Sequence, residues 1–81
     1  DVFCKELMAD QVHYMGVEKM EDGMRFLTKI RYAHQGAMAS VFLEHDGKLR
    51  VVFDEPQRAV TPGQAVVFYE QDCIAGGGVI L

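Results

Sequence analysis

The chain contains two cysteines and three histidines, the side chains that most often serve as nucleophiles or metal ligands. Cys4 and Cys73 stand near opposite ends without a CxxC pair, and His13, His34 and His45 lack the short spacing of zinc ligands. We therefore expect surface or loop roles for the histidines. Disulfide-stabilised domains are usually richer in cysteine, so we expect reduced thiols in a cytosolic protein, with one disulfide between the two cysteines as the alternative.

Three consecutive glycines at residues 76–78 form another candidate site, because glycine-rich loops can wrap a phosphate group. This GGG neither opens a helix nor precedes Lys-Ser or Lys-Thr, so the P-loop and dinucleotide-binding motifs are absent. Glycine weakens a strand unless the space is needed. We therefore expect a bulge, a barrel corner or a second backbone that passes close by.

Length and charge narrow the possible functions. At 81 residues, with 49% hydrophobic and 25% charged residues, the chain has the composition of one small globular domain. Its net charge of −4 argues against an autonomous nucleic-acid-binding protein, whereas a local positive face on a larger protein is compatible with it. No apolar run approaches the roughly 20 residues of a membrane helix, and no signal-peptide pattern is present. The chain begins at Asp1 with sequence typical of structure, so we expect a fragment of a longer protein.

Apolar residues recur mostly with a period of two, which predicts strands rather than helices. We expect strands at residues 2–8, 24–32, 38–45, 48–53, 65–69 and 73–81, with residues 10–16 as a short extended or turn segment. The clearest alternation places two sets of side chains on one face of their strands: Met24, Phe26, Thr28, Ile30 and Tyr32, and Leu49, Val51 and Phe53. Residues 65–69 are apolar on both faces, which indicates a strand buried on both sides or curled within a barrel.

The connections carry the residues that tight turns require. Asp22-Gly23 and Asp46-Gly47 predict hairpin turns, residues 61–64 (TPGQ) predict a type II turn, and residues 71–72 predict a further turn. Pro56 is expected to close the strand at 48–53, because proline donates no backbone hydrogen bond. Six or seven short strands joined by tight turns predict an all-β fold, a small antiparallel β-barrel.

Three blocks of the sequence resemble the C-terminal domain of the bacterial tRNA-specific 2-thiouridylases: KIRY at 29–32, FDEPQRAVTPGQAVVFY at 53–69 and CIAGGGVI at 73–80. A weaker match is ADQVHYMG at 9–16, where the family commonly has Asn-Trp and this chain has His13-Tyr14. The similarity covers almost all 81 residues. It implies that residues 1–81 form a single C-terminal β-barrel domain of a longer enzyme, similar to translation-factor-type barrels.

The resemblance also implies what the longer enzyme does. Enzymes of this family use ATP to activate C2 of the wobble uridine of certain tRNAs, and persulfide sulfur then replaces the oxygen. ATP binding and both catalytic cysteines belong to an N-terminal PP-loop domain, which is absent here together with the central domain. We therefore expect no catalytic residue and no cofactor in this chain. ATP and the contacts of a sulfur-relay protein belong to the other domains of a cytoplasmic enzyme that has no membrane partner.

The family's tRNA contacts correspond by motif to Arg31 and Tyr32 in KIRY and to Gln64 in TPGQ. An arginine can bind a phosphate through two hydrogen bonds, and a tyrosine can stack on a base. Gln64 can donate to the RNA backbone or to a base edge. Lys29 shares a strand face with Arg31 and could add positive charge. The alternative interpretations are a solvated surface arginine, a core tyrosine and an ordinary turn glutamine.

Two other functions are compatible with a small β-barrel. Residues 60–66 (VTPGQAV) show a corner pattern of translation-factor-type barrels, so the domain could dock a partner protein through residues 65–69 or a sheet edge without contacting RNA. A standalone ligand-binding barrel is the third possibility, although a barrel of 81 residues has little interior space. An upstream SGGVDS-like motif with two well-separated cysteines would identify the thiolase.

Overall fold

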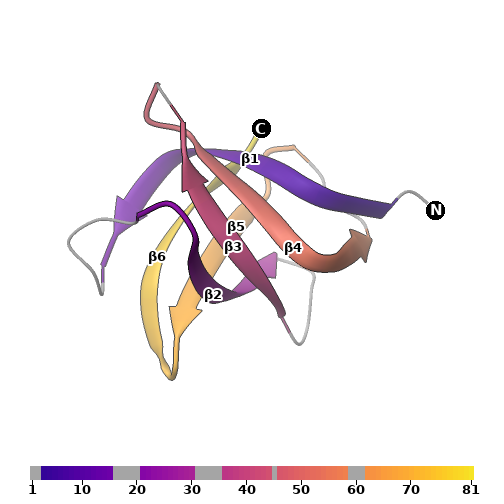
Figure 1. Cartoon of the computed structure of the whole chain (residues 1–81). Coiled ribbons are helices and arrows are strands. Elements are labelled where there is room, and N and C mark those ends of the chain that lie inside the picture. Colours follow the sequence, from indigo (N-terminus) through magenta and orange to yellow (C-terminus); the bar gives the residue numbers. More distant parts are fainter. Residues whose placement is uncertain (1–2, 16–20, 31–35, 45, 59–61) are drawn as a thin grey trace.

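A computed structural model describes residues 3–15, 21–30, 36–44, 46–58 and 62–81. These residues form six strands: β1 (Phe3–Tyr14), β2 (Met24–Ile30), β3 (Ala37–Leu43), β4 (Leu49–Arg58), β5 (Ala65–Glu70) and β6 (Cys73–Ile80). The strands pair antiparallel and close into a barrel in the order β1-β4-β3-β2-β5-β6 (Figure 1). The predicted all-β barrel is therefore confirmed, with six strands in the described part of the chain.

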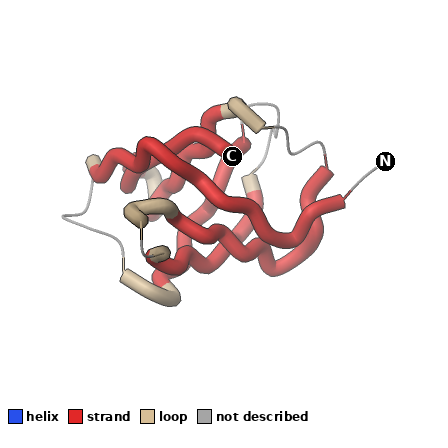
Figure 2. Tube along the Cα trace, turned by 90° about the horizontal axis from the view of Figure 1, so that it is seen from above, coloured by secondary structure: helices blue, strands red, loops and turns tan. Residues whose placement is uncertain are grey.

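The described trace contains no helix and consists mostly of strands (Figure 2). Accordingly, these residues include no helix long and apolar enough to cross a membrane. The predicted turns at Gly23 and Gly63 are confirmed by left-handed backbone angles, with φ of +85° and +91°. Such angles favour glycine because it has no Cβ to clash with the backbone.

The core is built from the inward faces that the alternation predicted. Phe26, Thr28 and Ile30 of β2 are buried, and so is the predicted set on β4. The rings of Phe26 and Phe68 lie 6.0 Å apart between centroids. Among the described residues, the apolar core consists of Leu7, Ala9, Phe26, Ile30, Ala39, Val41, Leu49, Val51, Phe53, Val66, Phe68, Ala75 and Ile80. Every strand contributes to it, so the interior is filled by side chains.

The first strand is longer than predicted, because residues 3–8 of the predicted strand and residues 10–14 of the predicted turn segment belong to one element. β1 pairs with β4 from Phe3 to Ala9 and with β6 from Ala9 to Tyr14. Gln11 has a positive φ of 50°, and the β1–β6 register shifts between Asp10 and His13. This bulge bends the strand from one neighbour to the other, as bulges do where a barrel closes.

The prediction that Pro56 ends its strand is wrong, since β4 continues to Arg58. Pairing with β3 stops at Phe53, which faces Ala39. Pairing with β1 changes register between Val52 and Gln57. Pro56 lies within this break in the hydrogen-bond ladder, where a missing donor costs little.

Candidate functional site

Lys29 lies on the outer face of β2, opposite to the buried Thr28 and Ile30. Its Nζ atom is 5.0 Å from the centroid of the Tyr69 ring on β5, a cation–π contact. The two strands are neighbours, and Lys29 itself pairs with Val67. The ammonium group is thus held above an aromatic face on the barrel surface.

Gln64 lies immediately before β5, after the Pro62-Gly63 turn. Its carbonyl oxygen accepts a hydrogen bond from the Ile80 amide (2.8 Å), and the Gly63 amide donates to the Ile80 carbonyl (2.7 Å). The last described pair between β2 and β5 is Ile30 with Val66. Gln64 therefore lies at the end of the strand pair that carries Lys29, about 10 Å along β5 from Val67.

Arg31 and Tyr32 lie outside the described residues, although they follow Ile30 directly in the chain. Of the four predicted contact residues, the structure therefore places Lys29 and Gln64. Lys29 lies within the β2–β5 pair, and Gln64 lies just before β5.

Most of the other described cations are neutralised by carboxylates. Arg25 pairs with Asp54, Lys48 pairs with Asp46, and Arg50 contacts both Glu44 (3.3 Å) and Glu6 (3.7 Å). The Arg25 hydrogen bond lowers the pKa of the Asp54 carboxyl. Among the described carboxylates, none pairs with Lys29 or with Lys5. The positive charge on the β2–β5 face is therefore left uncompensated by the described residues, in a chain whose net charge is −4.

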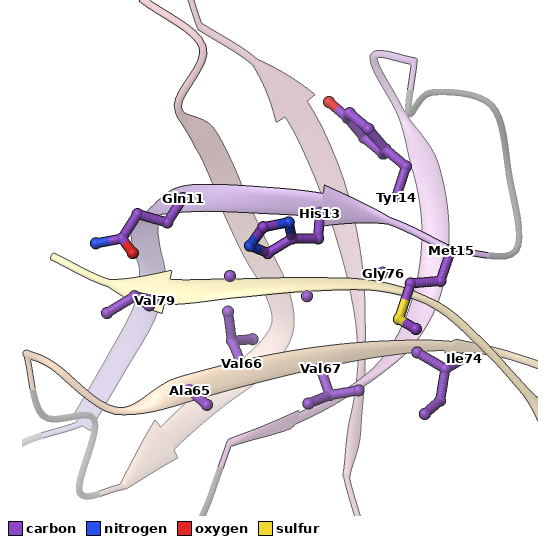
Figure 3. A pocket seen from close by; sticks show the side chains of 12 residues that line it. Gln11, His13, Tyr14, Met15, Ala65, Val66, Val67, Ile74, Gly76 and Val79 are labelled. Carbon is purple, nitrogen blue, oxygen red and sulfur yellow. The ribbon is translucent and has the colours of Figure 1, made fainter.

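Beside this face, a groove of about 560 Å³ runs over β6 between β1 and β5 (Figure 3). None of the described residues that line it is an Asp, Glu, Lys or Arg. The lining consists of Gln11, His13, Tyr14, Met15, Ala65, Val66, Val67, Ile74, Gly76, Gly77, Gly78 and Val79. In Figure 3 the His13 ring projects from β1 toward β6, and Met15 and Ile74 both line one end of the groove. The groove is therefore mainly apolar, with polar groups contributed by β1.

The three glycines of β6 form the floor of this groove. A Cβ on Gly77 would lie 2.9 Å from the Val66 carbonyl oxygen, and a Cβ on Gly78 would lie 2.9 Å from the Asp10 carbonyl oxygen. Both distances are too short for a side chain, so the expected close approach of neighbouring backbones is confirmed. Sequence reasoning found the glycines but missed the groove, because β1, which flanks them on one side, is distant from β5 and β6 in the chain.

The two cysteines form no disulfide; Cys4 is half-buried and Cys73 is exposed. Cys4 pairs with Gln57, whereas Cys73 pairs with Glu70. They thus belong to different strand pairs, and the alternative of a single bridge is not realised. The described residues also contain no group of three or more His, Cys, Asp or Glu side chains that could hold a metal ion.

Residues 4–80 match the family model of the aminomethyltransferase beta-barrel domain. The chain is 51% identical over 80 residues to the tRNA-specific 2-thiouridylase MnmA of Acetivibrio thermocellus, a match that covers 99% of this chain and 22% of the relative. It is 47% identical over 81 residues to the tRNA-specific 2-thiouridylase MnmA of Lachnoclostridium phytofermentans, covering 100% of this chain and 23% of the relative.

The chain therefore spans less than a quarter of the length of these relatives. The resemblance to the C-terminal domain of the tRNA-specific 2-thiouridylases is confirmed, and the chain belongs to the family of aminomethyltransferase β-barrel domains.

Proposed function

We propose that this barrel is the tRNA-docking domain of an ATP-dependent tRNA 2-thiouridylase. The two relatives are named tRNA-specific 2-thiouridylases, and each is more than four times as long as the matched region. In this proposal the other domains of the cytoplasmic enzyme bind ATP, receive sulfur from a relay protein and modify C2 of the wobble uridine. The barrel itself supplies no catalytic group.

The observation that carries the proposal is the uncompensated Lys29 ammonium above Tyr69. A lysine already paired with a carboxylate must break that pair to bind a phosphate, whereas Lys29 has no such partner among the described residues. Its packing over the ring also limits the side-chain freedom that would be lost on binding. Lys29 is therefore suited to contact an RNA phosphate.

Three further residues extend the contact. Arg31 and Tyr32 follow β2 directly in the chain, and we assign them phosphate binding and base stacking. Gln64, anchored to Ile80 through its backbone, would donate from its amide at the end of the same strand pair. The proposal thus needs a few local contacts rather than a broad basic face, consistent with a chain of net negative charge.

Charge reversal in the longer enzyme tests the proposal. We expect Lys29→Glu and Arg31→Glu each to weaken tRNA binding roughly tenfold at low salt, because one phosphate contact becomes a repulsion. The slope of log affinity against log salt concentration should fall by about one for each variant. ATP affinity should stay unchanged, since no ATP contact is assigned to the barrel.

Lys5→Glu is the matched control. Lys5 is exposed on β1, has no ion pair among the described residues, and undergoes the same change of charge. A general effect of net charge would weaken binding equally in the Lys5 and Lys29 variants. Equal losses, or no loss at Lys29 and Arg31, would contradict the assignment of the surface.

A further inference from the structure

The glycine-floored groove is continuous with the proposed RNA contact. His13 on β1 pairs with Gly77, Gly77 pairs with Val67 on β5, and Val67 pairs with Lys29. These four residues form one row across four neighbouring strands, and the first three line the groove. The groove also reaches Ile74, which pairs with Tyr69, the residue whose ring lies beneath the Lys29 ammonium.

We propose that this groove binds one unstacked base of the RNA, with the His13 ring as the stacking partner. The inference rests on the proposed RNA-docking function and adds a base-binding position to it. The Lys29 ammonium above Tyr69 lies beside the groove, where it can contact a phosphate of the RNA chain whose base occupies the groove. RNA-binding proteins commonly combine an aromatic ring for a base with a cation for the backbone.

The shape of the groove suits a flat ligand. Gly77, the pairing partner of His13, carries no side chain, so the floor of the groove is low where the His13 ring projects toward β6 (Figure 3). Met15 is 72% exposed and Ile74 is 43% exposed, so both present apolar surface to a ligand. The volume of about 560 Å³ is within the roughly 300–1,000 Å³ of ligand pockets.

Charge favours RNA over a basic peptide. The described lining contains no carboxylate to repel a phosphate or to attract a lysine or arginine. The described acidic groups that form ion pairs lie instead on β1, on β4 or in the β3–β4 turn: Glu6, Glu44, Asp46 and Asp54. Gln11 and His13 can supply hydrogen bonds to base edges without adding negative charge.

Variants of the protein combined with a complete and an abasic RNA test whether the groove binds a base. The 81-residue chain is titrated at low salt with a short single-stranded RNA and with the same RNA carrying abasic sugars. Binding is followed by NMR through the amides of Gly77, Gly78 and Val79. We expect the complete RNA to bind at least fivefold more tightly than the abasic RNA, and His13→Ala to abolish most of this difference.

His13→Phe should restore the preference for bases, because phenylalanine keeps a stacking face. Met38→Ala, an exposed strand residue outside the groove, is the control and should leave the preference unchanged. If complete and abasic RNA bind equally, or His13→Ala keeps the preference, the groove does not bind a base.

Lys29→Glu separates this inference from the proposed function. Weaker RNA binding in Lys29→Glu, with no effect of His13→Ala, would leave the RNA-docking role intact and overturn the base-binding groove. Failure of the chain to bind either RNA at low salt would overturn the base-binding groove, whereas the docking role is overturned by unchanged tRNA binding of the Lys29→Glu and Arg31→Glu variants of the longer enzyme. Shifts of the groove amides by an apolar peptide but not by RNA would instead identify a protein-docking site.

Discussion

Gly77, on the floor of the groove, has little freedom to change. Its ideal Cβ position lies 2.9 Å from the backbone oxygen of Val66 and 3.8 Å from the Val67 Cα. The atoms that obstruct a side chain belong to backbone, which cannot rotate away as a side chain can. The glycine is thus required by the pairing of β6 with β5 and not by an unusual backbone angle.

We predict that Gly77→Ala destabilises the domain by roughly 1–3 kcal/mol, because β5 and β6 must separate to admit the methyl group. Urea unfolding of the 81-residue chain followed by circular dichroism measures this loss. Gly47→Asn is the control, since nothing lies within 4 Å of its Cβ position and asparagine tolerates a φ of +83°. Equal stability of Gly77→Ala and the unchanged chain would show that β5 and β6 separate without a measurable cost, which would contradict the prediction.

At the scale of strands, a polar contact spans the outer face of β2, β3 and β4. Arg25 on β2 donates to the Ser40 hydroxyl on β3 (3.0 Å) and pairs with Asp54 on β4. The hydrogen bond from Arg25 is the main cause that lowers the pKa of Asp54 below its ordinary value of 3.8. Both charged side chains are about half exposed, so the contribution to stability is small.

The lowered pKa predicts a definite pH dependence. Because the folded-state pKa of Asp54 is below its unfolded value, the stabilisation is complete above the unfolded pKa and is lost as pH falls through the folded pKa. Asp54→Asn should therefore be less stable than the unchanged chain at about pH 6, with the difference shrinking below about pH 4. Arg25→Gln should remove the same pH-dependent part of the free energy of unfolding, because it removes the partner of Asp54. A difference that stays constant down to about pH 2 would contradict the coupling.

The turn before β2 is attached to the end of β3. The Leu43 amide donates to the Asp22 carboxylate (2.6 Å), and the Gly23 amide donates to the Val41 carbonyl (2.7 Å). These two bonds continue the β2–β3 pairing beyond Met24, which faces Val41. Asp22 therefore fixes the position of the turn as well as its geometry.

We predict that Asp22→Ala lowers the free energy of unfolding by about 0.5–1.5 kcal/mol, the usual net value of one hydrogen bond. Asp22→Asn keeps an acceptor oxygen and should lose less. Amide exchange at Leu43 gives a local readout, because its hydrogen should exchange faster in Asp22→Ala alone. Unchanged exchange at Leu43 in that variant would show that the bond does not persist in solution.

For the whole molecule, the balance of charge decides how strongly the barrel alone can hold RNA. The net charge is −4, while the proposed contact uses only a few residues on one face. Long-range attraction to RNA is therefore weak, and binding depends on local contacts. Connection to other RNA-binding domains raises the effective concentration to the order of mM, so that even weak contacts can contribute.

The isolated 81-residue chain should consequently bind tRNA at least about 100-fold more weakly than the longer enzyme. Its affinity should fall steeply between about 50 and 200 mM salt, because phosphate contacts release counterions. Fluorescence anisotropy with labelled tRNA at several salt concentrations measures both quantities. Binding that is tight or insensitive to salt would contradict a docking role based on a few phosphate contacts.

The sequence by itself determined the local features of this barrel. The alternation in residues 24–30 predicted which side chains of β2 are buried, and Asp-Gly and Pro-Gly pairs predicted the turns. The three ordered blocks of residues identified the family. These features depend on neighbours in the chain, since side-chain direction alternates residue by residue and a turn is a property of four residues.

Only the tertiary structure decided which strands meet and what lies between them. The continuity of β1, the passage of β4 through Pro56 and the contact of Lys29 with Tyr69 all depend on register between distant segments. The groove likewise forms because β1 and β5 lie on either side of the glycines of β6. Closure of the barrel sets all these registers together, so no local pattern in the chain could specify them separately.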